Sequence, residues 1–430
     1  MFSALRDVFR LPDLKSKILF VLGILFVFRL GAHIPTPGVD AKAMASLFEQ
    51  GGVLGLFDLF AGGALRRFSI FALGVTPYIN ASIVMQLLAV VVPAIEKMQK
   101  EGEEGRRKIT QYTRVLAILF ATIQAVGMVL WLKSMNIIYV SGVSVLVAVI
   151  TLVAGSIAVM WLGEMISDHG IGNGISLLIF AGIVVRVPES VVRTFVLLRA
   201  GEMNFLTLII AGAIMIVVIA GCIILQEGQR RLPVRYAKRV IGNKIYGGQS
   251  TFIPLRVNSA GVIPIIFASS VLLFPTTIAR FFSASFAQTI SKVLSPSSPI
   301  YMILYVLLII FFTYFYTAVV FNPIEVANNL KKYGGFIPGI RPGRPTADYI
   351  ERVLSRVTLG GAIFLAVIAL LPSLLTQMLG ITTFYFGGTA VLIVVGVALE
   401  TVQQIEAQLL MRHYEGLVRR KGKAGGILRL

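Results

Sequence analysis

Residues that could carry out chemistry are few in this chain, and their spacing fits no catalytic motif. The run DHGIGNGIS holds three closely spaced glycines, but its pattern is neither a dinucleotide fingerprint nor a phosphate loop. The histidines, His33, His169 and His413, are far apart, and no Gly-x-Ser-x-Gly or His-Glu-x-x-His motif is present. The single cysteine, Cys222, allows no disulfide within the chain and no cysteine metal cluster. We therefore expect no enzyme activity, no cofactor and no metal site.

Acidic residues near apolar stretches are the remaining candidates, because ion-coupled transport needs polar ligands near the middle of the membrane. Asp58, Glu164 and Glu400 are such residues. Each is interpreted more simply as a residue at the membrane interface, and a secondary transporter for an amphiphilic solute is kept as the alternative function. The pair Ile79 and Ile83 is one helical turn apart, a spacing that fits a helix-packing stripe or a pore lining.

The elements that would position these residues are membrane spans. Hydrophobic residues make up 57% of the 430 residues and charged residues only 14%, far from the balance of a soluble globular chain. Ten apolar segments have about the length that crosses a hydrocarbon core. They lie near residues 18–34, 74–95, 114–132, 143–163, 174–188, 205–226, 258–279, 300–321, 358–379 and 383–402.

Basic residues between these spans fall mostly in every second gap. Of the 39 Lys and Arg residues, 29 lie in the two terminal tails, in the loops after even-numbered spans or at adjoining span ends, and 9 lie on the opposite side. Positively charged loops stay in the cytoplasm, so both termini are predicted to be cytoplasmic. The net charge of +19 indicates attraction to anionic lipids, or a docking surface for an acidic or RNA-containing partner.

Residues 53–73 are apolar enough to suggest an eleventh span, but they contain Asp58, a Gly62-Gly63 pair and an Arg66-Arg67 pair. A crossing here would leave 12 basic residues inside and 26 outside, against the orienting rule. The segment is therefore expected to enter and leave on the outer side, with a half-helix at about 54–65. It is either enclosed by protein at membrane depth or an amphipathic helix at the outer interface.

Two cytoplasmic loops, 227–257 and 322–357, are long enough to be functional. The first interleaves seven basic residues with Tyr236, Tyr246 and Phe252, and its strand-prone residues followed by Gly-Gly predict projecting hairpins that bind a partner. The second has turn-forming Gly and Pro around two arginines. The shorter gap at 96–114 looks like an ordinary solvated loop.

Several longer stretches resemble the SecY family of translocon channel subunits. They are LRRFSIFALGVTPYINASIVMQLL, EGEEGRRKITQYTR, GIGNGISLLIFAGIV, AGVIPIIFASS, FNPIEVANNLKKYGGFIPGIRPG and FYFGGTAVLIVVGV. The resemblance implies an all-α integral membrane protein with ten transmembrane helices in two inverted five-helix halves, residues 1–200 and 201–430. It also implies a short re-entrant plug helix, a central pore, and a lateral gate between the second and seventh spans.

The resemblance assigns residues of this sequence to three sites. A constriction ring would consist of Ile79, Ile83, Ile179, Ile266 and Ile393. A plug at about 54–66 would include Leu56, Phe57, Asp58, Phe60, Gly62, Gly63 and Arg66. Positions for docking of partners on the cytoplasmic loops would be Arg235, Lys238, Arg239, Arg341 and Arg344.

The function implied is a protein-conducting channel that passes unfolded polypeptides across the membrane and releases membrane segments sideways. Implied partners are SecE-like and SecG-like membrane subunits, a SecA-type motor ATPase, a translating ribosome, signal peptides and anionic lipids. The implied location is the cell inner (cytoplasmic) membrane, with many spans and with the tail 404–430 in the cytoplasm. A deformable aliphatic ring suits this function, because it can seal around many different side chains.

Overall fold

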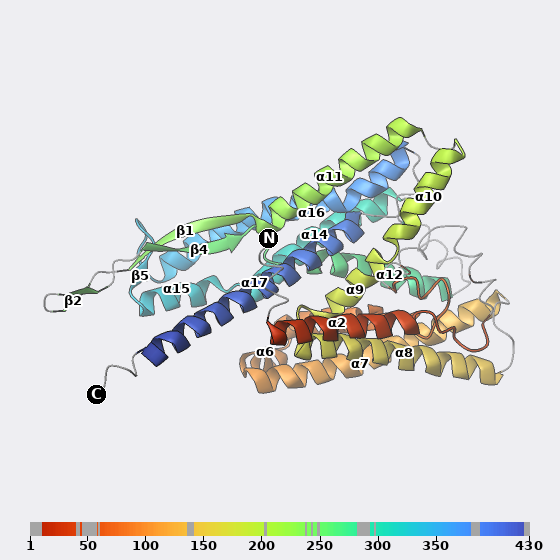
Figure 1. Cartoon of the computed structure of the whole chain (residues 1–430), viewed down its shortest axis with the longest axis horizontal. Coiled ribbons are helices and arrows are strands. Elements are labelled where there is room, and N and C mark those ends of the chain that lie inside the picture. Colours follow the sequence, from red (N-terminus) through yellow and green to blue (C-terminus); the bar gives the residue numbers. More distant parts are fainter. Residues whose placement is uncertain are drawn as a thin grey trace. The chain divides into compact units, whose positions relative to one another are not determined.

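The structure is a computed structural model of the whole chain (Figure 1). It describes residues 11–39, 44, 58, 61–135, 142–201, 204–236, 239–241, 244–246, 250–281, 293–295, 298–379 and 388–424. The chain forms two compact units. Unit 1 comprises Met1–Val192, Leu273–Ser291 and Ile393–Leu430, and unit 2 comprises Arg193–Leu272 and Lys292–Leu392.

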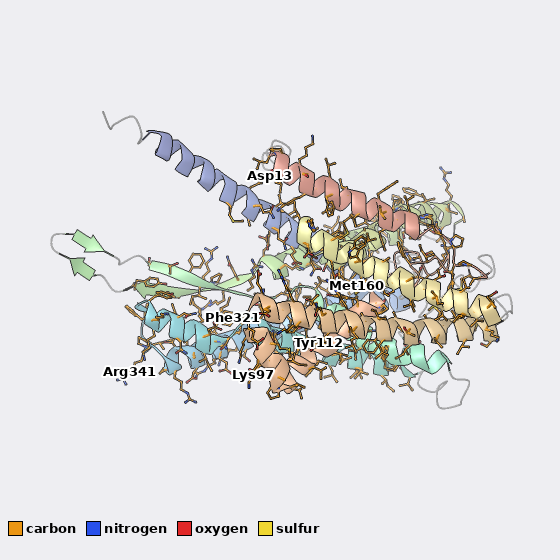
Figure 2. The ribbon with its side chains drawn as sticks, turned by 90° about the horizontal axis from the view of Figure 1, so that it is seen from below. Asp13, Lys97, Tyr112, Met160, Phe321 and Arg341 are labelled. Carbon is orange, nitrogen blue, oxygen red and sulfur yellow. The ribbon has the colours of Figure 1, made fainter. Side chains whose placement is uncertain are left out.

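Unit 1 is built from apolar helices that pack through small side chains. Ala81, Ala117 and Met160 form a buried cluster where α5, α7 and α8 meet, and Figure 2 shows Met160 on α8 beside α7. Alanine at such positions lets helix backbones approach closely, which favours packing between apolar helices in lipid. The helices of this unit are α2 (Pro12–Gly31), α5 (Thr76–Val91), α6 (Pro93–Lys100), α7 (Glu103–Ser134), α8 (Gly142–His169) and α9 (Gly174–Val184).

Three further helices contribute residues to both units: α10 (Val187–Arg199), α12 (Ile263–Phe281) and α17 (Gly388–Ala424). Unit 2 contains α11 (Phe205–Glu227), α14 (Pro299–Val320), α15 (Pro323–Lys332) and α16 (Arg344–Leu379). Within unit 2, α11, α14 and α15 all contact α16. The long helix α16 is therefore the element around which this unit is assembled.

A small antiparallel sheet extends from the end of α11 in unit 2 (Figure 1). Its strand order is β4-β1-β5, with β1 (Gln229–Tyr236) between β4 (Ser250–Arg256) and β5 (Gly335–Phe336). A second ladder, β2 (Arg239–Ile241) with β3 (Lys244–Tyr246), lies towards the tip of the hairpin. The predicted hairpin in loop 227–257 is therefore confirmed, and loop 322–357 adds the third strand.

One face of β1 supplies a compact apolar core beneath the sheet. Leu232 and Val234 are buried, whereas the alternate residues Arg231 and Arg235 are exposed, as a strand with one covered face requires. The cluster that covers this face consists of Leu232, Val234, Leu255, Leu330, Ile337, Ile350 and Leu354. The two long loops, 227–257 and 322–357, thus fold together on the start of α16.

Among the described residues, seven helical stretches are long and apolar enough to cross a membrane, or eight if the bent pair α5–α6 is one span. The two other predicted spans correspond to α12 and α2. The apolar part of α12, Ile263–Thr276, is short. The helix α2 carries Lys15, Lys17 and Arg29 among its twenty residues.

Several predicted boundaries are wrong, and local chemistry explains them. The second span ends at Val91, and α6 follows Val92 at an angle of 100°. Val92 has an extended backbone, φ −103° and ψ 109°, the region that a residue before proline prefers. The gap at 96–114 is mostly helix rather than an ordinary loop, and Glu103 and Glu104 occupy the first turn of α7, where carboxylates favour the helix dipole.

Two other helices extend into regions that were predicted as loop or tail. The ninth predicted span begins within α16, which already starts at Arg344. The helix α17 continues through the predicted tail to Ala424. Hydropathy marks the apolar part of a helix only, so polar continuations of these two helices escaped the prediction.

The packing of residues 69–75 on α8 gives the first testable prediction. Ser156 of α8 donates a hydrogen bond to the Gly74 carbonyl at 3.3 Å, and a Cβ atom at Gly155 would collide with the carbonyl oxygen of Ile70. We expect Gly155→Ala to lower the free energy of unfolding by about 1–3 kcal/mol, the usual cost of overpacking. The measurement is the thermal unfolding midpoint in detergent.

Gly212→Ala on α11 is the matched control, because no atom lies within 4 Å of the position that its Cβ would take. Alanine favours helix over glycine, so this variant should keep or slightly raise the midpoint. Equal midpoints for the two variants would contradict the packing of Ile70 against α8.

Candidate functional site

The chain leaves α2 and returns to its end before α5 begins. Pro35 and Ser69 form an antiparallel bridge. Thr36 N donates to Phe68 O at 2.9 Å, and Ile70 N donates to Ile34 O at 3.0 Å. Phe28 of α2 also stacks on Phe71, with ring centroids 5.9 Å apart. Both ends of the intervening segment therefore lie at the same end of α2, as expected for a segment that enters and leaves on one side.

The described part of the predicted plug is a compact turn. Asp58 is helical and residues 61–66 form turns, so the expected half-helix does not reach residue 65. Gly62 and Gly63 have φ of 65° and 85°, which only glycine adopts readily. A Cβ atom on Gly62 would lie 2.9 Å from the Cα atom of Gly182 in α9. This glycine therefore allows direct contact of the turn with α9. Leu56, Phe57 and Phe60 lie outside the described residues.

Asp58 is the polar centre of this turn. Its side chain is 3% exposed, so it is buried among protein groups, and its interpretation as a membrane-interface residue stays a prediction. One carboxylate oxygen, Oδ1, accepts hydrogen bonds from the backbone N–H groups of Leu65 and Arg66, each at 3.0 Å. The other oxygen, Oδ2, forms an ion pair with Arg186, which follows α9. Both oxygens of this buried carboxylate are thus bonded, as a buried charge requires.

Two other contacts join the turn to its surroundings. Arg29 of α2 donates to the carbonyl oxygen of Gly62 at 3.0 Å. Arg66 pairs with Glu189 of α10 at 3.0 Å, and both side chains are largely exposed. Sequence analysis missed Arg29, Arg186 and Glu189 as functional candidates. Charged residues within or just after apolar spans are the signal that could have found them, because such residues need a partner.

The five predicted ring residues lie on four helices, and all are buried. Ile79 and Ile83 are one turn apart on α5, Ile179 lies on α9, Ile266 on α12 and Ile393 on α17. Exposure of these side chains ranges from 0% to 6%. Burial of this kind occurs both in helix packing and in a closed constriction, so it is compatible with either role.

Local contacts fix the start of α9, which carries Ile179. The side chain of Asn173 caps this helix by accepting from Ser176 N at 3.3 Å. A Cβ atom on Gly174 would collide with the Gly163 carbonyl of α8, so α9 starts in direct contact with that helix. Gly172 N donates to Gln404 Oε1 of α17 at 2.9 Å. The loop that the glycine run forms is therefore a connector held by two neighbouring helices.

The predicted docking residues lie on the sheet and at the start of α16. Arg235 is exposed on β1, opposite Phe336 of β5. Arg341 is exposed, and its carbonyl oxygen accepts from Thr346 Oγ1 at 2.8 Å; Figure 2 shows Arg341 at the edge of unit 2. Arg344 is the first residue of α16 and is exposed. Arg239 begins β2, and Lys238 lies outside the described residues.

An exposed aromatic accompanies these arginines on the sheet. The guanidinium carbon of Arg231 lies 4.8 Å from the centroid of the Phe252 ring, and Phe252 is about half exposed. A guanidinium held over an aromatic ring in this way is attracted by the ring and still carries its positive charge at the surface. The sheet therefore presents positive charge beside apolar surface.

Metal-binding chemistry has no candidate in the described part of the chain, where no group of three or more His, Cys, Asp and Glu side chains could hold an ion. The pairs that do form are local. Arg114 of α7, for example, pairs with Glu164 of α8 at 2.8 Å. This contact joins two neighbouring helices and leaves Glu164 with a structural partner.

Comparison with known proteins extends these observations to the family. The SecY family model matches residues 69–402. The protein translocase subunit SecY of Vibrio cholerae serotype O1 is 47% identical over 427 residues, which cover 96% of each chain. None of the similarities supports the alternative of a secondary transporter.

Two solved structures share the fold. One is a SecY protein whose plug domain is described as stabilising the closed state of the translocation channel, with a TM-score of 0.64 and 20% identity over 90% of this chain and 91% of that one. The other is Sec61 in the canine ribosome-channel complex, with a TM-score of 0.59 and 17% identity over the same shares. From the family model, the near full-length identity and this fold, we conclude that the chain belongs to the SecY family of protein translocase subunits.

Proposed function

We propose that this chain is the protein-conducting channel subunit of a translocase, which passes unfolded polypeptides across the cytoplasmic membrane and releases membrane segments sideways. The observation that carries this proposal is 47% identity with a SecY subunit along nearly the whole of both chains. A set of long apolar helices that could cross a membrane agrees with it. Reconstitution of the chain with its partners and measurement of precursor protein uptake into vesicles would test the proposal directly.

The constriction proposed for this channel is the set Ile79, Ile83, Ile179, Ile266 and Ile393. Aliphatic side chains are deformable and are poorly wetted by water. A ring of them could close around polypeptides of different sequence and still hinder ions. This suits a channel that has to accept every type of side chain, since specific polar contacts would hold some substrates back.

The proposed architecture has ten transmembrane helices in two inverted halves, residues 1–200 and 201–430, with residues 54–66 as a plug and a lateral gate between spans 74–95 and 258–279. The return of residues 69–70 to the end of α2 supports an outer or re-entrant position for the plug, because an odd number of crossings would separate those two ends. The proposed location is the inner membrane, with both termini cytoplasmic.

The proposed partners follow from the family and from the exposed basic sheet. SecE-like and SecG-like subunits would be neighbours in the membrane, and signal peptides would open the channel. A SecA-type motor or a translating ribosome would bind near Arg235, Lys238, Arg239, Arg341 and Arg344. A ribosome accompanies the related canine Sec61. Anionic lipids would attract the basic cytoplasmic loops.

Labelling of single cysteines tests the topology. Ile34 and Arg67 are both exposed, and they lie on the two sides of the proposed re-entrant segment. In a Cys222→Ser background, we expect Ile34→Cys and Arg67→Cys to react with an impermeant maleimide from the outer side of the membrane. Arg341→Cys, on the proposed cytoplasmic surface, should react only from the inner side. Reaction of Ile34→Cys and Arg67→Cys from opposite sides would refute the ten-span arrangement.

Charge reversal tests the docking surface. Because Arg235 and Arg341 are exposed, the double change to Glu should leave the fold intact and weaken motor-driven translocation at least several-fold. The loss should be larger at low salt, where exposed charges act over about 10 Å or more. Lys133→Glu makes the same charge change as either single reversal, on an exposed residue of the opposite side, so it should retain normal translocation where Arg235→Glu or Arg341→Glu alone already weakens it. Normal activity of the double variant would remove these arginines from the docking site.

Polar substitution tests the constriction. If Ile83 and Ile266 line a closed pore, changing both to Asn should wet it and raise resting ion conductance in planar bilayers, with little loss of folded protein. Ile166→Asn is the control, because Ile166 is fully buried in α8 and has no proposed place in the ring. The control should lose about 1–3 kcal/mol of stability by burying an unsatisfied amide. A folded but electrically tight double variant would show that these isoleucines only pack helices.

A further inference from the structure

The two oxygens of Asp58 have different partners, and this division gives them different tasks. Oδ1 accepts only from backbone N–H groups of the same turn, those of Leu65 and Arg66. Oδ2 instead pairs with Arg186, which lies 128 positions further along the chain. The first oxygen therefore shapes the turn, and the second connects the finished turn to the junction between α9 and α10.

The positive charges around this turn make the Asp58 carboxylate necessary. Arg186 is only 20% exposed, so its guanidinium is largely withdrawn from water. Arg29 also reaches the turn by donating to the Gly62 carbonyl oxygen at 3.0 Å, and Arg66 and Arg67 belong to the turn itself. Breaking a buried ion pair from one side leaves an uncompensated charge, which is much less favourable than losing an exposed pair. Without the negative charge of Asp58, the neighbouring arginines would repel one another beside the turn.

We propose that Asp58 and Arg186 form a latch that holds the turn at residues 61–68 against the α9–α10 junction. This inference rests on the proposed role of the segment as a plug and names the contact that controls its release. Shape contacts such as that of Gly62 with Gly182 position the turn but act over a very short range. Loss of the Asp58–Arg186 ion pair also leaves the positive charges around the turn to repel one another. The strength of this pair therefore sets how readily the turn moves away from the α9–α10 junction.

Local thiol accessibility in full-length protein tests the latch. Ala61 is 1% exposed, so Ala61→Cys in a Cys222→Ser background reports whether the turn is seated. Asp58→Asn keeps an oxygen that can accept from Leu65 N and Arg66 N but removes the charge that pairs with Arg186. We expect this variant to react with an impermeant maleimide in sealed proteoliposomes at least ten times faster than the parent while its thermal midpoint stays well above the labelling temperature.

Variants of Arg186 test the same ion pair without any change to Asp58, so they do not depend on whether a substitution of Asp58 disturbs the turn itself. Arg186→Gln should accelerate labelling to a similar extent, and Arg186→Lys should remain closer to the parent because it keeps the positive charge. The double variant D58N/R186Q should react no faster than Asp58→Asn alone, since both changes remove the same contact. Glu189→Gln is the control: its pair with Arg66 is exposed and should matter little, so labelling should stay within twofold of the parent.

Parent-like labelling of Asp58→Asn or of Arg186→Gln would overturn the latch, as would multiplicative acceleration in the double variant. Fast labelling of a variant whose thermal midpoint lies near or below the labelling temperature would also count against it, because global unfolding would then explain the exposure. The labelling needs no substrate and no motor. Failure of the parent to translocate precursor proteins would therefore reject the proposed function without deciding the latch.

Discussion

Every backbone N–H and C=O group in a hydrocarbon environment has to find its hydrogen-bond partner within the protein, and the structure follows from this constraint. Long apolar helices satisfy it by themselves. The turns at residues 61–75, before α5, satisfy it locally: Gly63 N bonds to Asp58 O, Ser69 N to Ala64 O, and Arg29 reaches the Gly62 carbonyl. In this described segment, the irregular backbone is paired with groups of the protein itself.

The same constraint explains the surroundings of the buried carboxylate of Asp58 in unit 1. A carboxylate without water needs donors, and Asp58 obtains them from two backbone N–H groups and Arg186. The proposed constriction uses the opposite chemistry, since its isoleucines offer no polar group. An apolar barrier tolerates many substrates, whereas a charged contact gives a defined seated position to the segment proposed to close it.

Much of the fold could be predicted from the sequence, because hydropathy and charge act on long segments. Each of the ten predicted spans has a helix in the structure, and the hairpin of loop 227–257 is present. Polar ends of helices were missed: α7 begins at Glu103, α16 at Arg344, and α17 runs on to Ala424. α6 packs against α7, and the core beneath the sheet covers Ile350 and Leu354 of α16, so tertiary contacts support the polar starts of these two helices, and hydropathy does not contain that information.

The candidate site was predicted less completely, for a different reason. The resemblance to the family proposed single residues such as Ile79 and Asp58, but it did not say which other residues of the chain they contact. Arg186 meets Asp58 only after α9 has placed it beside the turn, and Gln404 meets Gly172 only after α17 has packed near α8. Contacts between residues more than a hundred positions apart depend on tertiary structure, so single-sequence patterns could not predict them.

The hydrogen bond between Gln404 and Gly172 gives the last helix a mechanical property. The helix α17 is continuous over 37 residues, which at 1.5 Å per residue makes a rod of about 55 Å. Gln404 fixes this rod to the α8–α9 connector at an intermediate point, with Ile393 on one side and the C-terminal end, Ala424, on the other. The arm from Gln404 to Ala424 is about 30 Å and the arm from Gln404 to Ile393 about 16 Å, so this contact would act as a pivot. A displacement of about 4 Å at Ala424 would move Ile393 by about 2 Å in the opposite direction.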